Sequence, residues 1–520
     1  MKEEVLRMDR ITFREQGTTE LNHFCLDIDA GEIVGLIPIN DTGLGALIRL
    51  LRQNLPLHYG YVYYRGRLVN HWQESDLTYN RIGVIESRSG LADDLTVADN
   101  VFVLRQGFKK RIIRRKVLNR QLEPFLRETG VKLSAEMYAR DLTAFPRFIT
   151  ELVKAVVAGC RLIVLMEPAS VISDARLATL QRILRHYAGE GISFLYVSRH
   201  YEEARQICTR AAIMLNGEIA KVVPTADTLP ETLQCFGVEA YTQMVRRQER
   251  AKPLPPATAP ALMLRDLRFE HIRSLNLSVA PGECVVLQDL NNHILRDLIA
   301  LLSGARKPDG GQLLVRGKAL AARHLRDVAV IQQQPAASML FPDLSYMDNL
   351  CFTLDHRTPG VWRRSAPKAS VRAELAPLLG EDVIDKPVEQ LSQREKYDLV
   401  YTRVLLQRPG VAVCVQPFMG ADVEQRMQIW KLMERLLEKG IAVLILAVNL
   451  ADSLALADRL IRVLGGAVQA VYSREDFGSL PPGTPWHDFW VNPERCFHAD
   501  AIPNTGSVAP IAPNQPQNQP

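Results

Sequence analysis

Residues 31–45 read GEIVGLIPINDTGLG and run directly into ALIRLL at positions 46–51. A second stretch has the same design, with GECVVLQDLNNHIL at 282–295 followed by RDLIALL at 296–302. In each stretch an apolar run is followed by a short polar loop, after which apolar residues recur at helical spacing. Both stretches therefore predict a buried strand, a tight loop and an amphipathic helix.

The two loops have the frame of a phosphate-binding loop but not its chemistry. A loop of the G-x-x-x-x-G-K-[S/T] type cradles phosphates with its amides, reaches the β- and γ-phosphates with its lysine, and holds Mg²⁺ with its hydroxyl. Counted from each Gly-Glu pair, the lysine position is Leu44 in the first stretch and Leu295 in the second. The hydroxyl position is Gly45 in the first and Arg296 in the second. The residues that act on phosphate are therefore missing from both copies.

The composition is that of a globular protein with more than one domain. The chain has 520 residues, of which 47% are hydrophobic and 23% charged. A net charge of +5 over this length does not favour nucleic acid as a partner, and eight cysteines without a C-x-x-C pair favour reduced, buried thiols. No apolar run approaches the roughly 20 residues of a membrane span. The opening MKEEVLRMDRITF lacks a signal-peptide core, so we expect a cytoplasmic protein.

The two stretches are part of an internal repeat. Gly31 and Gly282 are 251 positions apart, and LT at 142–143 recurs 249 positions later as LS at 391–392. Nearly constant offsets over several elements indicate tandem domains. A Pro/Ala-rich run at 251–260 divides the chain and is typical of a linker.

This pattern predicts an α/β fold in two domains. We expect a first domain at 1–245, a linker at 246–261, a second domain at 262–482, and a tail at 483–520 that is disordered from about residue 503. Strands are expected at 8–13, 33–37, 162–165 and 192–197, and again at 263–269, 285–287, 411–415 and 442–447. Polar helical insertions are expected at about 95–140 and 344–390.

Short motifs beyond the loops fit a known family. LTVADNV at 95–101 recurs as LSYMDNL at 344–350, and GADV at 420–423 and ADR at 457–459 follow in the second copy. In this order they resemble the ATP-binding-cassette ATPases, and more narrowly the tandem ATP-binding subunits of bacterial monosaccharide importers of the ribose and galactose type. The resemblance covers roughly residues 5–480. It implies two tandem P-loop NTPase-type domains, each with a helical insertion, which face each other head to tail and form composite nucleotide sites.

The resemblance assigns nucleotide binding to the first loop. Pro38 stands at the leading glycine and has no N–H to offer a phosphate, and Asp41 replaces another glycine with a negative charge. Four residues of this degenerate loop remain cofactor-binding candidates: Asn40, Thr42, Gly43 and Gly45.

Two aromatic residues are further candidates for binding the cofactor. Phe13 and Phe269 lie where the family stacks adenine, and they fit core positions of their strands equally well.

The metal and base positions are altered as well. The family's Mg²⁺-holding aspartate falls at Met166 and Val415, and an apolar side chain cannot ligate a hard cation. The adjacent base position keeps Glu167 in the first copy and becomes Gln416 in the second. Glu167 is therefore the catalytic candidate, as a base that polarises water. No metal ligand is identified, and Mg²⁺ binding is left open.

The signature and switch positions differ from the family pattern too. The LSGGQ-like signature reads LTAFP at 142–146 and LSQRE at 391–395, so a side chain such as Phe145 would intrude where backbone must approach phosphate. The switch histidine position holds Arg199, with His200 one residue later. For His200 a helix-cap role is the alternative to a switch role.

Three functions remain open on the sequence. Losses at nearly every phosphate-contacting position favour a pseudo-ATPase, an importer-type subunit that acts as scaffold or regulator of a membrane permease or another partner. It would bind ATP weakly if at all, lie on the cytoplasmic face of the inner membrane, and pair its two domains within the chain, with a homodimer left open. The second reading is an active ATPase for monosaccharide import, with Glu167 as base and Arg49 or Arg296 in place of the lysine. The third is a soluble non-catalytic signalling protein.

Overall fold

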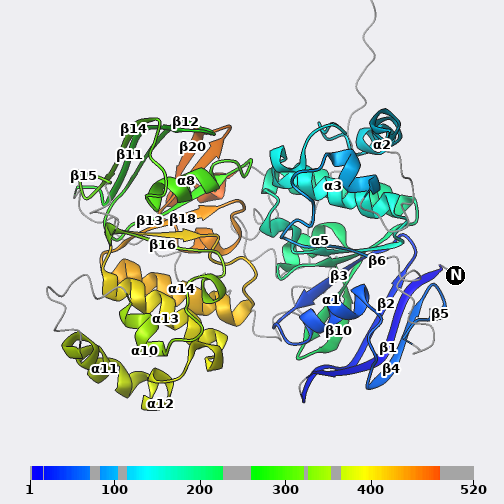
Figure 1. Ribbon diagram of the computed structural model, residues 1–520, viewed down its shortest axis with the longest axis horizontal. Coiled ribbons are helices and arrows are strands. Elements are labelled where there is room, and N and C mark those ends of the chain that lie inside the picture. The colour runs from blue at the N-terminus through cyan, green and yellow to red at the C-terminus, as the bar shows by residue number, and fades with distance from the viewer. Residues whose placement is uncertain are drawn as a thin grey trace, which may run out of the picture.

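Two α/β halves make up the part of the chain that the structure describes (Figure 1). The computed structural model describes residues 3–15, 17–70, 82–103, 114–225, 259–320, 326–352 and 365–480. Most of the predicted linker and all of the predicted tail lie outside these residues.

The first half contains two sheets. A four-stranded antiparallel sheet has the order β2 (Thr18–Asp29), β1 (Glu4–Glu15), β4 (Tyr59–Tyr64), β5 (Arg67–Leu68). A six-stranded sheet has the order β10 (Glu218–Pro224), β9 (Arg210–Leu215), β3 (Ile33–Pro38), β8 (Ser193–Val197), β7 (Leu162–Met166), β6 (Ile82–Ile85). All strands of the larger sheet are parallel except β10. Strands β3 and β8 are buried along their whole length, which explains their continuous apolar sequence.

The second half repeats this strand order in one ten-stranded sheet. The order is β15 (Lys318–Ala319), β14 (Gly310–Val315), β11 (Leu262–Phe269), β12 (Ile272–Val279), β20 (Ala467–Ser473), β19 (Arg459–Leu464), β13 (Cys284–Asp289), β18 (Ala442–Ala447), β17 (Val411–Val415), β16 (Val328–Ile331). The run β19-β13-β18-β17-β16 matches β9-β3-β8-β7-β6. The predicted tandem α/β fold is therefore confirmed.

Helices cover the sheets and form the two insertions. In the first half these are α1 (Leu44–Arg52), α2 (Arg115–Thr129), α3 (Ala144–Val157), α4 (Asp174–Gly189) and α5 (Tyr201–Ile207), with short turns of helix at Asp99–Val103, Ala139–Asp141 and Pro168–Ser170. In the second half they are α8 (Leu295–Leu302), α9 (Pro335–Ser338), α10 (Tyr346–Cys351), α11 (Ser365–Leu379), α12 (Glu381–Ile384), α13 (Gln393–Gln407) and α14 (Val423–Glu438), with short turns at Val388–Gln390, Ala451–Ala455 and Arg474–Ser479.

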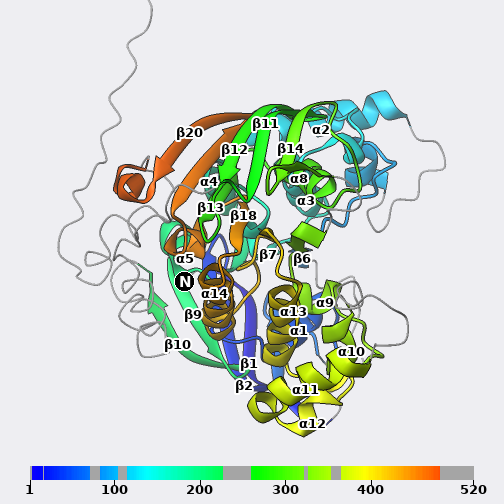
Figure 2. The same cartoon turned by 90° about the vertical axis from the view of Figure 1, so that its left-hand side faces the viewer.

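The halves are arranged head to tail. In Figure 1 the helices α2 and α3 lie at the opposite end of the molecule from α10, α11 and α12. Figures 1 and 2 both place α8 of the second half level with α3 of the first, and α13 level with α1. The helix after each phosphate-type loop therefore faces the signature helix of the other half.

The carboxyl ends of three parallel strands meet at one edge of each central sheet. In the first half, β3 pairs in parallel with β8, and β8 with β7. The residues that follow them, at 39–43, Glu167 and Arg199, are thus brought together, as loops at the carboxyl edge of an open α/β sheet are.

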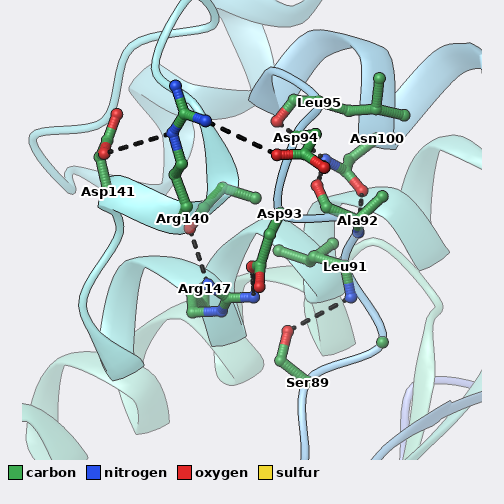
Figure 3. Close-up of polar contacts among 12 residues, drawn as sticks. Ser89, Leu91, Ala92, Asp93, Asp94, Leu95, Asn100, Arg140, Asp141 and Arg147 are labelled. Carbon is green, nitrogen blue, oxygen red and sulfur yellow. Dashed lines mark hydrogen bonds and ion pairs between the residues drawn. The ribbon is translucent and has the colours of Figure 1, made fainter.

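A buried asparagine holds the start of each helical insertion. The side-chain amide of Asn100 donates to the backbone oxygens of Ala92, Leu95 and Thr96, and its oxygen accepts from the amide of Ala92 (Figure 3). Asn349 makes the same four bonds in the second half. The repeated asparagine of the sequence motif is therefore explained by the backbone groups that its side chain satisfies.

No helix in the described ranges combines the length and apolarity needed to span a bilayer.

Candidate functional site

The first phosphate-type loop is held by contacts within its own half. The side chain of Asn40 donates to Asn216 Oδ1 (2.6 Å) and accepts from the Asn216 amide (3.1 Å), which ties the loop to the turn between β9 and β10. Gly43 has φ of 80°, and a Cβ there would stand 2.3 Å from the Glu20 oxygen. Asn40 and Gly43 therefore stabilise the conformation of the loop. Their binding of nucleotide stays a prediction.

The side chain at the lysine position of the first loop, Leu44, lies in the hydrophobic core. Leu44 is buried and packs in the cluster formed by β1, β2 and α1. Its amide donates to the Asp41 oxygen (3.3 Å). Thr42 is exposed, and the space around Gly45 is open. The loop thus offers no side-chain cation to a phosphate.

An arginine occupies the centre of the first site. Arg199 follows β8, and its side chain is only 7% exposed. Its Nε donates to Glu167 Oε1 (2.7 Å), and one of its terminal nitrogens donates to the carboxylate of Asp41. The guanidinium therefore joins the loop after β3 to the end of β7.

Electrostatics keep this arginine charged. Burial alone would lower the pKa of Arg199, but the carboxylates of Glu167 and Asp41 outweigh burial, so the net effect raises it. Glu167 has φ of 45°, a conformation that most side chains avoid, and it is held there with its carboxylate already paired. The candidate base is thus engaged by a protein cation.

The second loop holds an anion of its own. Asp289 is 1% exposed, and its carboxylate accepts the backbone amides of Asn291 (3.1 Å), His293 (2.6 Å) and Ile294 (2.7 Å). A working phosphate loop aims such amides at a phosphate. The carboxylate of Asp289 therefore fills the nest that a phosphate would need. The sequence carried a signal for this, since an aspartate at the leading-glycine position can fold back onto the amides after it.

The metal position provides no oxygen ligand in either half. Met166 packs against the core of the first half, and Val415 is buried in the core of the second. These side chains do not fit a Mg²⁺ ion.

One group in the described residues has metal-ligand chemistry: Glu270, His271 and Asp297, whose ligand atoms lie within 4.8 Å of one another. Glu270 already pairs with Arg306 (3.3 Å), and Asp297 with the amide and ring of His271. Hydrogen bonds and ion pairs within the protein therefore account for this group.

The aromatic candidates lie in the cores. Phe13 is 8% exposed and Phe269 is 5% exposed, and each belongs to the hydrophobic cluster under its sheet. The guanidinium of Arg306 lies 5.5 Å from the ring centre of Phe269. Adenine stacking on either ring stays a prediction.

The signature positions are occupied differently in the two halves. Phe145 at the start of α3 is buried in the core of the first half, and its intrusion on a phosphate position stays a prediction. Helix α13 begins at the capping box of Ser392 and Glu395, and Arg394 is exposed beside Glu424.

His200 is the residue immediately before α5, as the helix-cap reading predicts, although its side chain makes no cap bond. Its Nδ1 lies 3.2 Å from a nitrogen of Arg426, which belongs to the second half.

Groups from the second half close over the first site. Tyr397 on α13 is buried, and burial, followed by the charge of Asp41, raises the pKa of its hydroxyl to about 12. Gly420 lies beside the carboxylate of Glu167, since a Cβ added to this glycine would stand 3.9 Å from a carboxylate oxygen. Burial is also the largest influence on Asp422, and it raises the pKa of that carboxyl. The site is thus composite, as the resemblance implies.

Comparisons with known proteins find relatives along almost the whole chain. No protein-family model matches it. It is 24% identical over 486 residues to the ribose import ATP-binding protein RbsA of Halalkalibacterium halodurans, a match that covers 91% of this chain and 96% of the relative. It is 23% identical over 479 residues to RbsA of Corynebacterium glutamicum, covering 89% of each chain.

Among solved structures, cbiO1 from Clostridium perfringens, part of an ABC transporter complex, matches 47% of this chain and 96% of its own, with 14% identity and a TM-score of 0.39. The two halves repeat one strand order, and over nine-tenths of its length the chain is similar to proteins named as ribose import ATP-binding proteins.

Proposed function

We propose that this chain is the cassette subunit of a sugar import system that has lost efficient ATP hydrolysis and acts as scaffold or regulator of its partner. The observation that carries the proposal is that charged groups of the protein itself pair with one another or with backbone amides at both loops. Arg199 bridges Asp41 and Glu167 in the first site, and Asp289 fills the amide nest in the second.

The charges of the first site disfavour a triphosphate. Its carboxylates, Asp41 and Glu167, share the one guanidinium of Arg199, and the lysine position is the buried Leu44. A triphosphate would bring further negative charge against these carboxylates without a Mg²⁺ ligand at Met166 to offset it. Nucleotide binding would therefore be weak or absent.

The proposed partner is a membrane permease, with the chain at the cytoplasmic face of the inner membrane. The relatives are named import proteins, which supports this placement. An exposed aromatic pair in the second half adds an apolar surface for a protein partner: Phe341 is 45% and Phe352 is 55% exposed, with ring centres 4.8 Å apart. Nucleic acid is not a proposed partner, and self-association of the chain is left open.

An active import ATPase is the alternative, because Glu167 is still present at the end of β7. Of its two proposed substitutes for the lysine, Arg49 is bound by both carboxylate oxygens of Glu15 (2.7 and 2.5 Å). Arg296 is exposed on α8. An active enzyme would have to break the pair between Arg199 and Glu167 before the carboxylate could act on water.

Calorimetric titration of the full chain with ATP–Mg²⁺, together with phosphate release, tests the proposal. We expect no saturable binding at micromolar nucleotide and no turnover above a buffer blank. Glu167→Gln is compared with Glu86→Gln, which changes an exposed carboxylate paired with Arg52. Micromolar binding with turnover that is lost only in Glu167→Gln would sink the proposal in favour of the active ATPase.

A further inference from the structure

The two halves contact each other through the segment that follows β7. Asp174 is 1% exposed at the start of α4, and its carboxylate accepts the side-chain amide of Gln288 (2.9 Å) near the end of β13. It also lies 3.4 Å from the amide of Leu450. Gln288 is fully buried, so this carboxylate–amide bond is shielded from water and from salt.

Two further bonds fasten the same segment. The side chain of Asn449 donates to the Ala169 oxygen, and that of Asn292 donates to the Val171 oxygen (3.3 Å). Both donors come from the second half, one from the loop after β18 and one from the second phosphate-type loop. Backbone oxygens of the first half are thus satisfied by side chains of the second.

A second set of contacts runs in the same direction, from a donor of the second half to acceptors of the first. Arg426 of α14 is 5% exposed, and its guanidinium reaches Nδ1 of His200 (3.2 Å) and the Arg199 oxygen (3.4 Å). Arg199 is the residue that holds Asp41 and Glu167. A buried arginine of the second half therefore supports the arginine that fills the first site.

Groups of the chain itself partner the carboxylates around this interface. Arg199 pairs with Asp41 and Glu167, and Arg426 contacts the backbone oxygen of Arg199. The buried carboxylate of Asp174 accepts the Gln288 side chain and the Leu450 amide instead. A buried carboxylate without such partners would be costly, so these contacts favour the closed arrangement.

One cavity between the halves, beside Glu167 and His200, is small. This cavity of about 40 Å³ lies between the two segments, with Glu167 and His200 on one wall and Gln416 and Asn449 on the other. A water molecule takes up about 10–15 Å³ in this kind of measure, and drug-sized ligands need several hundred. The cavity has room for a few waters.

We infer that the two halves form a closed pair that needs no nucleotide, and that the interface centred on Asp174, Arg199 and Arg426 is a permanent one. The inference does not rest on the proposed function, since a closed pair could exist whether or not ATP is hydrolysed. The inference means that the two halves of this chain keep one closed conformation, whereas two halves that open and close with nucleotide would alternate between two conformations.

A distance measurement between spin labels in the full chain tests this inference. Labels are placed on cysteines at Gln53, which is exposed at the end of α1, and Gln393, which is exposed at the start of α13. The exposed Cys25, and Cys235 and Cys496 outside the described residues, are changed to serine. Nucleotide-free protein should give one short, narrow distance population that ATP–Mg²⁺ does not change.

Matched arginine variants show whether the interface holds the pair. Arg426→Met should lose the short population or broaden it, because it removes the bonds to His200 and Arg199. Arg403→Met is the control, since Arg403 is 7% exposed and donates to Met339 within the second half. It should leave the distance unchanged.

Two results would overturn the inference. One is a long or broad distance in nucleotide-free protein that shortens on addition of ATP–Mg²⁺, and the other is the same response from both arginine variants. Titration of the labelled protein separates this inference from the proposed function. If the labelled protein binds micromolar ATP and turns it over while the distance stays short, the proposed function fails and the closed pair stands.

Discussion

At the scale of single residues, several of the lost phosphate contacts are matched by contacts within the chain. Leu44 and Leu295 fill the cores beneath their loops, where an ammonium group would be costly to bury. Asp289 supplies the negative charge that the amides of the second loop would otherwise seek from a ligand. A loop of converging amides is unstable without an acceptor, so the loss of nucleotide and the gain of this aspartate belong together.

Replacing Asp289 should show that the amides of the second loop depend on its carboxylate as their acceptor. In Asp289→Ala three buried or half-buried amides lose their acceptor, and we expect the free energy of unfolding to fall by about 2 kcal/mol. Millimolar inorganic phosphate should then raise the urea midpoint of the variant but not of the native protein, because the empty nest again suits an anion.

The exposed Asp309 provides the control for this experiment. Asp309→Ala should change stability by no more than about 0.5 kcal/mol and show no response to phosphate. Equal stability of the two variants, or equal stabilisation of both by phosphate, would mean that Asp289 does not stand in for a ligand.

At the scale of elements, the two signature helices differ in how they begin. Helix α13 starts with a capping box, in which Ser392 accepts the Glu395 amide (3.3 Å) and Glu395 accepts the Ser392 amide (2.7 Å). Helix α3 starts at Thr143, whose side chain makes no cap bond. The signature helix of the second half is thus stabilised by its own side chains, whereas α3 relies on the packing of residues such as Phe145.

This difference predicts unequal responses to the same type of mutation. Ser392→Ala should lower the free energy of unfolding by about 1 kcal/mol, because the variant leaves helix amides without their acceptor. Thr143→Ala removes no cap bond and should be close to neutral. Guanidinium unfolding of both variants measures the contrast, and a larger loss in Thr143→Ala would show that the cap of α13 contributes nothing.

At the scale of the whole molecule, the repeat of two α/β halves was predictable from the sequence. Which side chains pair with one another at the two loops was not predictable. The strands predicted at 411–415 and 442–447 have the observed bounds. Continuous apolar runs between polar loops are typical of strands buried on both faces of a parallel sheet. The strand predicted at 8–13 extends to Glu4–Glu15, because antiparallel pairing with β2 recruits polar residues that carry no strand signal.

The arginine at the centre of the first site could not be placed from sequence. A switch-position arginine was visible at position 199, but its partners are far away along the chain, at Asp41 and Glu167. Only the parallel pairing of β3, β8 and β7 brings the three together. The same holds for Glu32, where the sequence offered a Gly-Glu pair without a partner for the carboxylate.

That glutamate links the start of β3 to β9 and makes stability depend on pH. Arg210 donates to Glu32 (2.8 Å), and the Asp29 amide donates to it as well (3.1 Å). Burial is the largest single influence and would raise the pKa of Glu32, but these bonds together outweigh it and lower the pKa below its ordinary value of 4.5. Glu283 and Arg459 repeat the pair in the second half.

Because the folded pKa of Glu32 lies below the unfolded one, its contribution to stability is fully present above about pH 4.5 and is lost as the pH falls through the folded value. Glu32→Gln should therefore lower the urea midpoint at neutral pH and make the midpoint fall less steeply below pH 4.5. The exposed Glu123, paired with Arg127 one turn later in α2, serves as the control, and Glu123→Gln should follow the native curve closely. An unchanged acid slope in Glu32→Gln would show that the pair with Arg210 does not govern the acid stability of the first half.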